Sequence, residues 1–357
     1  MGNLINKTMN VLSLFDGMSC GQQALERAGI KVDNYFASEI DKYAIQVTMA
    51  NYPNTIQLGS VVNVKGGGVP KIDILIGGSP CQSFSFAGKR KGMSTKDEQE
   101  ILTLDHYLEL KSEGFQFEGQ SYLFWEYMRL LNEVKPKYFL LENVMMGEKW
   151  EKVLSKAIGV KPIMINSALL SAQNRQRLYW TNIGLEPQGL FGDLYSIIEQ
   201  PKDKGILLKD ILELKVSDKY FISNKMISTF EIHKERHLEK GSGFGFLPKN
   251  GDNKANCLRT NPGVCPTDNM IKIFGGDFRY DEGYRWRDGG KSGTLCTNAE
   301  SFAKINSSIR KLTPIECERL QTVKDNYTNH VSDSQRYKMI GNGWTVDVIV
   351  HILKYIK

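Results

Sequence analysis

Long apolar runs and closely spaced cysteine pairs are both missing from this 357-residue sequence. The longest apolar stretches, near 72–76 and 346–356, fall far short of the roughly 20 residues that a membrane-spanning helix needs. Six cysteines occur, at positions 20, 81, 257, 265, 296 and 317, and none forms a Cys-x-x-Cys pair. This scatter argues against a zinc site or a redox pair and favours reduced thiols. We therefore expect a cytoplasmic protein with no membrane segment, no metal and no secretory leader.

A strong excess of either charge is also missing. The chain has 46 basic and 40 acidic residues, which gives a formal net charge of +6. A mildly basic chain permits a polyanionic partner without requiring one. The length suggests about two domains.

Short apolar runs alternate with amphipathic stretches in the first half of the chain. We expect strands at 11–15, 35–39, 72–76 and 138–141, and helices at 22–28, 42–51, 122–134 and 148–158. This alternation is typical of an α/β domain, in which helices cover both faces of a parallel sheet. Ligands of such sheets bind at the carboxyl ends of the strands. Further extended segments are expected at 163–166 and 178–183.

From residue 185 to residue 309 the pattern changes to glycine-rich turns and short apolar runs, which predicts a separate, loop-rich domain with short strands. Helices are expected again at 313–320 and 333–339. A last helix, at 344–356, has an apolar face of Val348, Ile349, Ile352, Leu353 and Ile356 that needs a partner surface. The first domain's sheet is the obvious partner. We therefore predict a discontinuous first domain, residues 1–184 and 310–357, and a second domain, residues 185–309.

Two strand ends carry a pattern typical of nucleotide sites. The first predicted strand leads into Phe15-Asp16-Gly17-Met18-Ser19-Cys20-Gly21, whose small residues let a ligand approach the backbone before a helix N-terminus. An ordinary strand–helix turn explains this segment equally well. Glu39 ends the next strand, about 20 residues further on, where an acid binds ribose hydroxyls. Together the two features indicate a nucleotide-type cofactor.

Three further strand ends or starts carry candidate reactive groups. Cys81 follows Gly77-Gly78-Ser79-Pro80 and precedes a basic, polar segment; positive surroundings lower a thiol pKa from its usual value of about 8.5. The alternative is a small buried hydrophobe. Glu142 ends another strand and could equally be a helix cap. Arg175 and Arg177 are two residues apart before an extended run, hence on one face, although alone they suggest an ordinary surface.

The combination of these motifs resembles the cytosine-C5 DNA methyltransferase family. The shared order is the Asp-Gly turn, Glu39, Pro80-Cys81, Glu142-Asn143-Val144 and Gln173-x-Arg175-x-Arg177. Near the end, Arg310-x-Leu312-Thr313-Pro314-x-Glu316-x-x-Arg319-Leu320-Gln321 and Tyr337-Lys338-Met339-Ile340-Gly341-Asn342-Gly343-Trp344 resemble the family's last two motifs. The match covers the first half and the last fifty residues or so. It has bacterial or phage character, with a first motif similar to that of the vertebrate de novo enzymes.

The resemblance implies a Rossmann-like methyltransferase sheet, a smaller target-recognition domain and methyl transfer to C5 of a cytosine in double-stranded DNA. Cys81 would add to C6 as the nucleophile, and Glu142 would hold or protonate N3. Of Arg175 and Arg177, one would face the base carbonyl and the other would support the active-site loop. C6 is inaccessible inside a duplex, so the base would be flipped out, at a cost of a few kcal/mol.

The resemblance also implies a cofactor, S-adenosyl-L-methionine. Its expected contacts come from the first turn, the second strand end, a third motif and the last motif: Phe15, Asp16, Gly17, Met18, Ser19, Cys20, Glu39, Ile40, Ser60, Val61, Pro80, Asn342, Trp344, Thr345 and Val346. One position departs from the family. An aspartate usually follows the glycine of the third motif, and here Gly59 is followed by Ser60.

DNA contacts are expected from the basic segment after Cys81 and from residues 185–309, which correspond to the variable region of the family. Thr294-Leu295 resembles a pair that family members have near the end of their variable region. The candidates are Ser83, Ser85, Lys89, Arg90, Lys91, Arg259, Arg285, Arg287 and Lys291. Arginine reading guanine is the commonest specific contact, although ordinary surface charge explains any single one. Only +1 of the net charge lies in residues 185–309. Binding would therefore depend on where individual arginines lie. We expect a monomer.

The stretch between Lys91 and Tyr122 is longer than in compact members of the family. We expect an extra helix at 102–111, and the family's arginine is missing from 119–124. The insertion is either a surface decoration or a longer DNA-contacting arm.

Two alternatives to a DNA methyltransferase remain. A tRNA methyltransferase of the same fold usually carries a Cys-Phe-Thr signature, which this sequence lacks. A catalytically silent DNA-binding relative tends to lose the cysteine or the glutamate, and Cys81 and Glu142 are both present.

Overall fold

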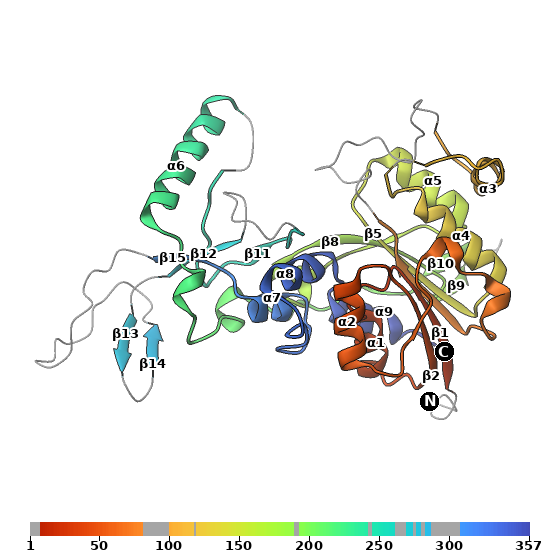
Figure 1. Cartoon of the computed structure of the whole chain (residues 1–357), viewed down its shortest axis with the longest axis horizontal. Helices are drawn as coiled ribbons and strands as arrows, with labels where there is room; N and C mark the ends of the chain where they lie inside the picture. The colour runs from red at the N-terminus through yellow and green to blue at the C-terminus, as the bar shows by residue number, and fades with distance from the viewer. Residues whose placement is uncertain are drawn as a thin grey trace, which may run out of the picture.

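A seven-stranded sheet is the centre of the fold, with helices on both of its faces (Figure 1). The computed structural model describes residues 8–80, 100–117, 119–188, 193–241, 245–260, 269–273, 276–279, 283–286 and 308–357. Within them, the sheet has the strand order β3-β2-β1-β4-β5-β8-β6. Its strands are β1 (Met9–Leu14), β2 (Val32–Ser38), β3 (Ile56–Gln57), β4 (Ile74–Gly78), β5 (Tyr138–Val144), β6 (Ile163–Asn166) and β8 (Gln176–Thr181).

The predicted all-parallel sheet is wrong at one edge. The strands from β3 to β5 pair in parallel, but β8 runs antiparallel to both β5 and β6. Only residues 167–175 separate β6 from β8, and a parallel crossover needs about a dozen residues or more. The chain therefore turns back and inserts β8 between the two parallel strands.

Helices cover both faces of the sheet, as predicted. One face packs against α1 (Cys20–Arg27), α2 (Lys42–Asn51) and α9 (Val346–Leu353), and the other against α4 (Leu123–Val134) and α5 (Glu148–Ile158). Alternate residues of β1 enter separate cores, Val11 on the first face and Leu12 with Leu14 on the second, because side chains alternate along a strand. The expected apolar face of the last helix is confirmed for Val348, Ile349, Ile352 and Leu353, which are at most 2% exposed. The helix ends at Leu353, earlier than predicted, so Ile356 lies beyond it and packs partly buried against the same core.

The insertion after residue 91 contains the expected helix, α3 (Leu104–Ser112). Its Tyr107 is buried and donates a hydrogen bond to Glu126 of α4, a carboxylate that is fully buried. Lys111 of α3 and Arg129 of α4 also bind Glu126, at 2.5 and 2.7 Å. A buried carboxylate needs such partners, so α3 is anchored on α4 by a buried polar cluster.

The variable region has the short strands that we expected. They are β9 (Leu185–Gln188), β10 (Asp193–Ser196), β11 (Ala255–Asn256), β12 (Met270–Ile273), β13 (Gly276–Arg279) and β14 (Gly283–Trp286). It also contains a 16-residue helix, α6 (Asn224–Glu239), of which only Phe230 is buried. Figure 1 shows α6, β13 and β14 far from the seven-stranded sheet. By contrast, Ile198 and Leu208 belong to the same core as the sheet, and the domain boundary at 185 stays a prediction.

The last two motifs form a compact unit beside the sheet. They span β15 (Ser308–Lys311), α7 (Pro314–Leu320) and α8 (Asp333–Asn342). Arg310 and Glu316 form a two-point ion pair, with N–O distances of 2.6 and 2.7 Å, and neither side chain is more than 1% exposed. Glu316 also completes a capping box with Thr313 at the start of α7. This pair fixes β15 against α7.

Short 3₁₀ turns complete the described secondary structure, at Val61–Asn63, Gly66–Gly68, Ser167–Leu169, Leu208–Asp210 and Asp218–Tyr220, together with the short strand β7 (Gln173–Asn174). Among the residues that the structure describes, no helix is both long and apolar enough to cross a membrane. The same residues contain no group of three or more side chains that could hold a metal ion.

Candidate active site

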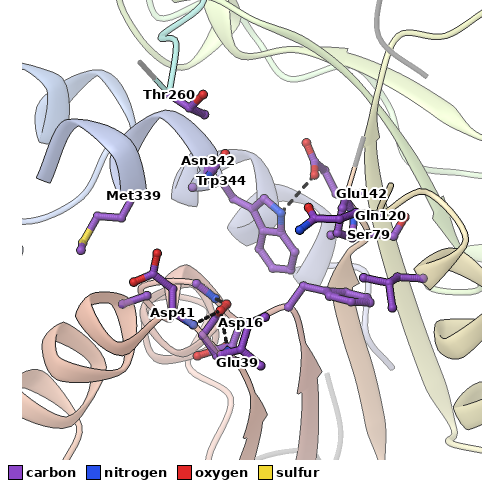
Figure 2. A pocket seen from close by; sticks show the side chains of 18 of the residues that line it. Asp16, Glu39, Asp41, Ser79, Gln120, Glu142, Thr260, Met339, Asn342 and Trp344 are labelled. Carbon is purple, nitrogen blue, oxygen red and sulfur yellow. Dashed lines mark hydrogen bonds between the residues drawn. The ribbon is translucent and has the colours of Figure 1, made fainter. Parts of the chain in front are cut away.

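A cavity of about 990 Å³ opens at the carboxyl ends of β1, β2, β4 and β5. Its walls contain the residues that follow each strand, and α8 with the loop before α9 closes one side (Figure 2). Leu258, Arg259 and Thr260 of the variable region also line it. The cavity therefore lies at the edge of the sheet where the sequence pattern predicts ligand binding. It is lined both by the strand ends and by residues of the 185–309 region.

The first turn has an unusual backbone. Phe15, Gly17 and Ser19 have φ values of 57°, 58° and 62°, and a non-glycine residue in this left-handed region carries local strain. Tyr35 donates a 2.7 Å hydrogen bond to Oδ1 of Asp16, whereas Oδ2 is buried without a partner. Burial raises the pKa of Asp16 to about 6. The turn thus holds an incompletely satisfied carboxyl at the cavity wall.

Glu39 ties the first two strand ends together. Its carboxylate accepts backbone N–H groups from Gly17, at 2.8 Å, and from Ile40 and Asp41, at 2.7 and 2.8 Å. Ile40 projects its side chain outward and is 72% exposed. Across the cavity, Lys338 of α8 forms a 2.7 Å ion pair with Asp41.

Most of the predicted cofactor residues line this cavity. They are Phe15, Asp16, Gly17, Cys20, Glu39, Ile40, Ser60, Val61, Pro80, Asn342 and Trp344. Four do not: Met18, Ser19, Thr345 and Val346 are at most 1% exposed and lie behind the wall. Thr345, for example, accepts a hydrogen bond from Ser167 and donates one to Gln321. Such residues support the cavity wall from within the core.

Several residues that line the cavity were not predicted from the sequence. Gln335, Lys338 and Met339 of α8 face the cavity, and their spacing of three and four residues places them on one side of a helix that continues to Asn342. That spacing could have revealed them. Ser38, Gln120 and Leu258 also line the cavity, and nothing in their local sequence distinguishes them.

Glu142 is held at the end of β5 by two donors. Nε of Arg177 lies 2.9 Å from Oε1, and the indole nitrogen of Trp344 donates to Oε2 at 3.2 Å (Figure 2). The residue paired with Glu142 on β4 is Gly78. A Cβ atom there would lie 2.9 Å from the indole nitrogen and 3.1 Å from Oε2, so only glycine fits without displacing the pair.

The two arginines reach the same region from the β7–β8 segment. Arg175 is 3% exposed, and its guanidinium donates to the carbonyl groups of Gly341 and Gly343 at 3.0–3.3 Å. Arg177 holds Glu142. Both guanidinium groups also contact the sulfur of Cys257. The structure therefore brings Glu142, Arg175 and Arg177 into one cluster at the cavity wall.

Several predicted residues lie outside the described ranges: Cys81, Ser83, Ser85, Lys89, Arg90, Lys91, Arg287 and Lys291. Arg285 falls in β14, of which the strand path alone is described. Pro80, which directly precedes Cys81, lines the cavity, and so does Arg259.

Solved structures show the same fold. A methyltransferase of Entamoeba histolytica, EhMeth, aligns with a TM-score of 0.62 at 16% identity, and the Dnmt2 methyltransferase of S. pombe aligns at 0.65 and 14%; each alignment covers 98% of both chains. Together with the mixed sheet and its two helical layers, they establish a Rossmann-like methyltransferase fold.

Several sequence relatives are named as type II methyltransferases. The chain is 28% identical to M.NlaX of Neisseria lactamica, over 97% of this chain and 96% of the relative. It is 29% identical to M.HpaII of Haemophilus parainfluenzae, over 97% and 88%. The family model described as C-5 cytosine-specific DNA methylase matches residues 9–357. This confirms the resemblance of the sequence motifs, and the chain belongs to the C-5 cytosine-specific DNA methylase family.

Proposed function

We propose that this protein methylates C5 of a flipped cytosine in double-stranded DNA, through a covalent bond between Cys81 and C6, with S-adenosyl-L-methionine as the methyl donor. The observation that carries the proposal is the placement of Glu142 between Arg177 and Trp344, in the wall of the cavity that also contains Pro80 and Glu39. One cavity thus joins the candidate base site to the candidate cofactor site.

The residues at the β1 and β2 ends fit the cofactor. A carboxylate offers about four acceptor positions, and the backbone uses three of those on Glu39, which leaves one for a ribose hydroxyl. The carboxyl of Asp16, a residue that also lines the cavity, is a second acidic group at the same wall. Ile40 would lie against the adenine ring, and Ser60, also at the wall, would offer a hydroxyl where the family has a carboxylate. When bound, the cofactor supplies an electrophilic methyl group on a sulfonium.

The base chemistry falls to Cys81 and the Glu142 cluster. Cytosine C5 is a poor nucleophile, so the Cys81 thiolate adds to C6 and the C5–C6 π electrons become available at C5. Glu142 holds a proton at N3 and offsets the charge that develops on the ring. After C5 has accepted the methyl group, it loses its proton, and expulsion of the thiolate restores the ring. Arg177 keeps Glu142 in place throughout.

DNA binding would involve residues 185–309 as a target-recognition domain, together with the basic segment after Cys81. Arg259 supports this role, because it belongs to the variable region and lines the cavity. The near-neutral charge of 185–309 means that contact depends on individual side chains such as this one. We further propose a cytoplasmic monomer.

The covalent step is testable with duplex DNA that contains 5-fluorocytosine, because fluorine cannot leave C5 as a proton does. The target site is first identified by bisulfite sequencing of a plasmid from expressing cells. With that duplex, a denaturation-stable protein–DNA adduct is expected, and the variant Cys81→Ala should form none. Absence of the adduct at a competent site, or methylation of tRNA in place of DNA, would overturn the proposal.

A further inference from the structure

Cys257 lies between the two arginines of the active-site cluster. Its sulfur is 3.2 Å from Nη1 of Arg175 and 3.6 Å from Nη2 of Arg177. Arg177 uses two different nitrogens for its two partners, since Nε binds the carboxylate of Glu142 and Nη2 binds the sulfur. A residue of the variable region is therefore part of the packing that orients both arginines.

The segment around Cys257 is fixed to the methyltransferase domain by its backbone. Ala255 and Asn256 pair with Gln173 and Asn174 as β11 and β7. The next residue after Cys257, Leu258, donates its N–H to the Gln173 side chain at 2.8 Å. The following residue, Arg259, packs against Gly341 at the end of α8. A Cβ atom on Gly341 would lie 2.4 Å from the carbonyl oxygen of Arg259, so these two backbone segments approach as closely as glycine permits. The sulfur is therefore held in register with the arginines.

Charge supports the same assignment. Two guanidinium groups face the sulfur, and Glu142, which binds Nε of Arg177, supplies one negative charge. Burial alone would raise the pKa of Cys257, but Arg175 and Arg177 outweigh it and lower the pKa below its usual value. A thiolate at this position would balance the second cation. The other two described cysteines, Cys20 and Cys317, are buried thiols with raised pKa values.

We propose that Cys257 is a positioning residue whose sulfur holds Arg175 and Arg177 in the arrangement in which Arg177 supports Glu142. The proposal rests on the function proposed above. It assigns Cys257 no contact with the base; Cys257 acts through the arginines. A truncated side chain would let Arg177 relax away from Glu142, and small displacements of catalytic groups reduce turnover strongly.

The electrostatic part is tested without any activity measurement. Isotope-coded iodoacetamide labelling of the full chain between pH 5 and 9, with peptide mapping, gives the pH midpoint for alkylation of Cys257. We expect a midpoint below that of a cysteine in a model peptide, and a higher midpoint in Arg177→Gln. The proposal is wrong if Cys257 titrates like the peptide cysteine, or if the midpoint is the same in both proteins.

The positioning part is tested by kinetics. Cys257→Ala should lower kcat about tenfold and leave the KM for DNA nearly unchanged. Cys257→Ser retains an acceptor but does not ionise, so it should recover part of the activity at low pH and fall further behind the wild type as pH rises.

The matched control is Asn256→Ala, an exposed neighbour, which should behave like the wild type. Wild-type kcat and pH profile in Cys257→Ala would refute the proposal. If the wild-type protein methylates no DNA, the proposed function is wrong. The iodoacetamide titration of Cys257 would still test its contact with the two arginines.

Discussion

The indole nitrogen of Trp344 donates a hydrogen bond to Oε2 of Glu142 across 202 positions of sequence. The contact joins the last motif of the chain to the carboxylate at the end of β5. Arg177 binds the other oxygen of this carboxylate, so each oxygen of Glu142 has one donor. The indole also lines the cavity. One side chain thus borders the proposed cofactor site and orients the proposed N3 partner.

Replacing Trp344 by phenylalanine should separate these two roles. The ring is retained, so cofactor affinity should change little, whereas Glu142 loses a donor. Hydrogen bonds to charged groups contribute about 1.5–3 kcal/mol, so kcat should fall at least about tenfold. Tritiated methyl transfer measures kcat, and calorimetry measures cofactor affinity. An unchanged kcat would show that Arg177 alone orients the carboxylate.

Gly78→Ala should disrupt the same contact from the opposite strand. The new Cβ would lie 2.9 Å from the indole nitrogen and 3.1 Å from the Glu142 carboxylate, closer than side chains tolerate, so the pair must move apart. We expect a loss of activity of more than about tenfold with the fold retained. Gly67→Ala is the matched control, because a Cβ there meets no atom within 4 Å. Equal activity of the two variants would contradict this account.

Cofactor affinity should depend on pH through Asp16. Burial raises the pKa of this carboxyl to about 6, so in the free protein it is largely neutral at pH 5 and ionised at pH 7. S-adenosyl-L-methionine is cationic and favours the ionised form. Its Kd should therefore decrease as pH rises from 5 to 7, when measured by calorimetry. Asp16→Asn retains an oxygen for Tyr35 but cannot ionise, and its Kd should be flat over this range. A wild-type Kd that is equally flat would count against Asp16 as a cofactor contact.

The buried pair of Arg310 and Glu316 should dominate the stability of the C-terminal motifs. Removal of one partner leaves an uncompensated buried charge, so Glu316→Gln should lower the free energy of unfolding by about 3–5 kcal/mol. Urea unfolding followed by circular dichroism measures this. The double variant Arg310→Met/Glu316→Leu should be less destabilised than the single one, because no unpaired charge remains. The exposed pair of Glu148 and Lys152 is the control, and its removal should have no measurable effect. A double variant as unstable as the single one would show that packing, and not charge, is responsible.

Much of the fold could be predicted because its signals are local. The helix predicted at 148–158 has these same bounds in the structure, because its buried Trp150 and Leu154 are one turn apart and Gly159 ends it in a left-handed conformation. The long helix α6 was not predicted as a whole: it buries only Phe230, so its apolar periodicity is weak. The direction of β8 was also missed, because alternation in a strand shows which residues are buried but not which way the strand runs.

The sequence by itself determined the family, the alternating strands and helices, and the candidates Glu39, Glu142, Arg175 and Arg177, because each depends on residues within a few positions of one another. Only the tertiary structure decided which of these groups meet. Arg175 contacts Cys257 and Gly341 over separations of 82 and 166 residues, and Lys338 crosses the cavity to Asp41 over 297. Such contacts follow from how the sheet, the variable region and the last helices pack, and local patterns of hydrophobicity and turn residues carry no record of that packing.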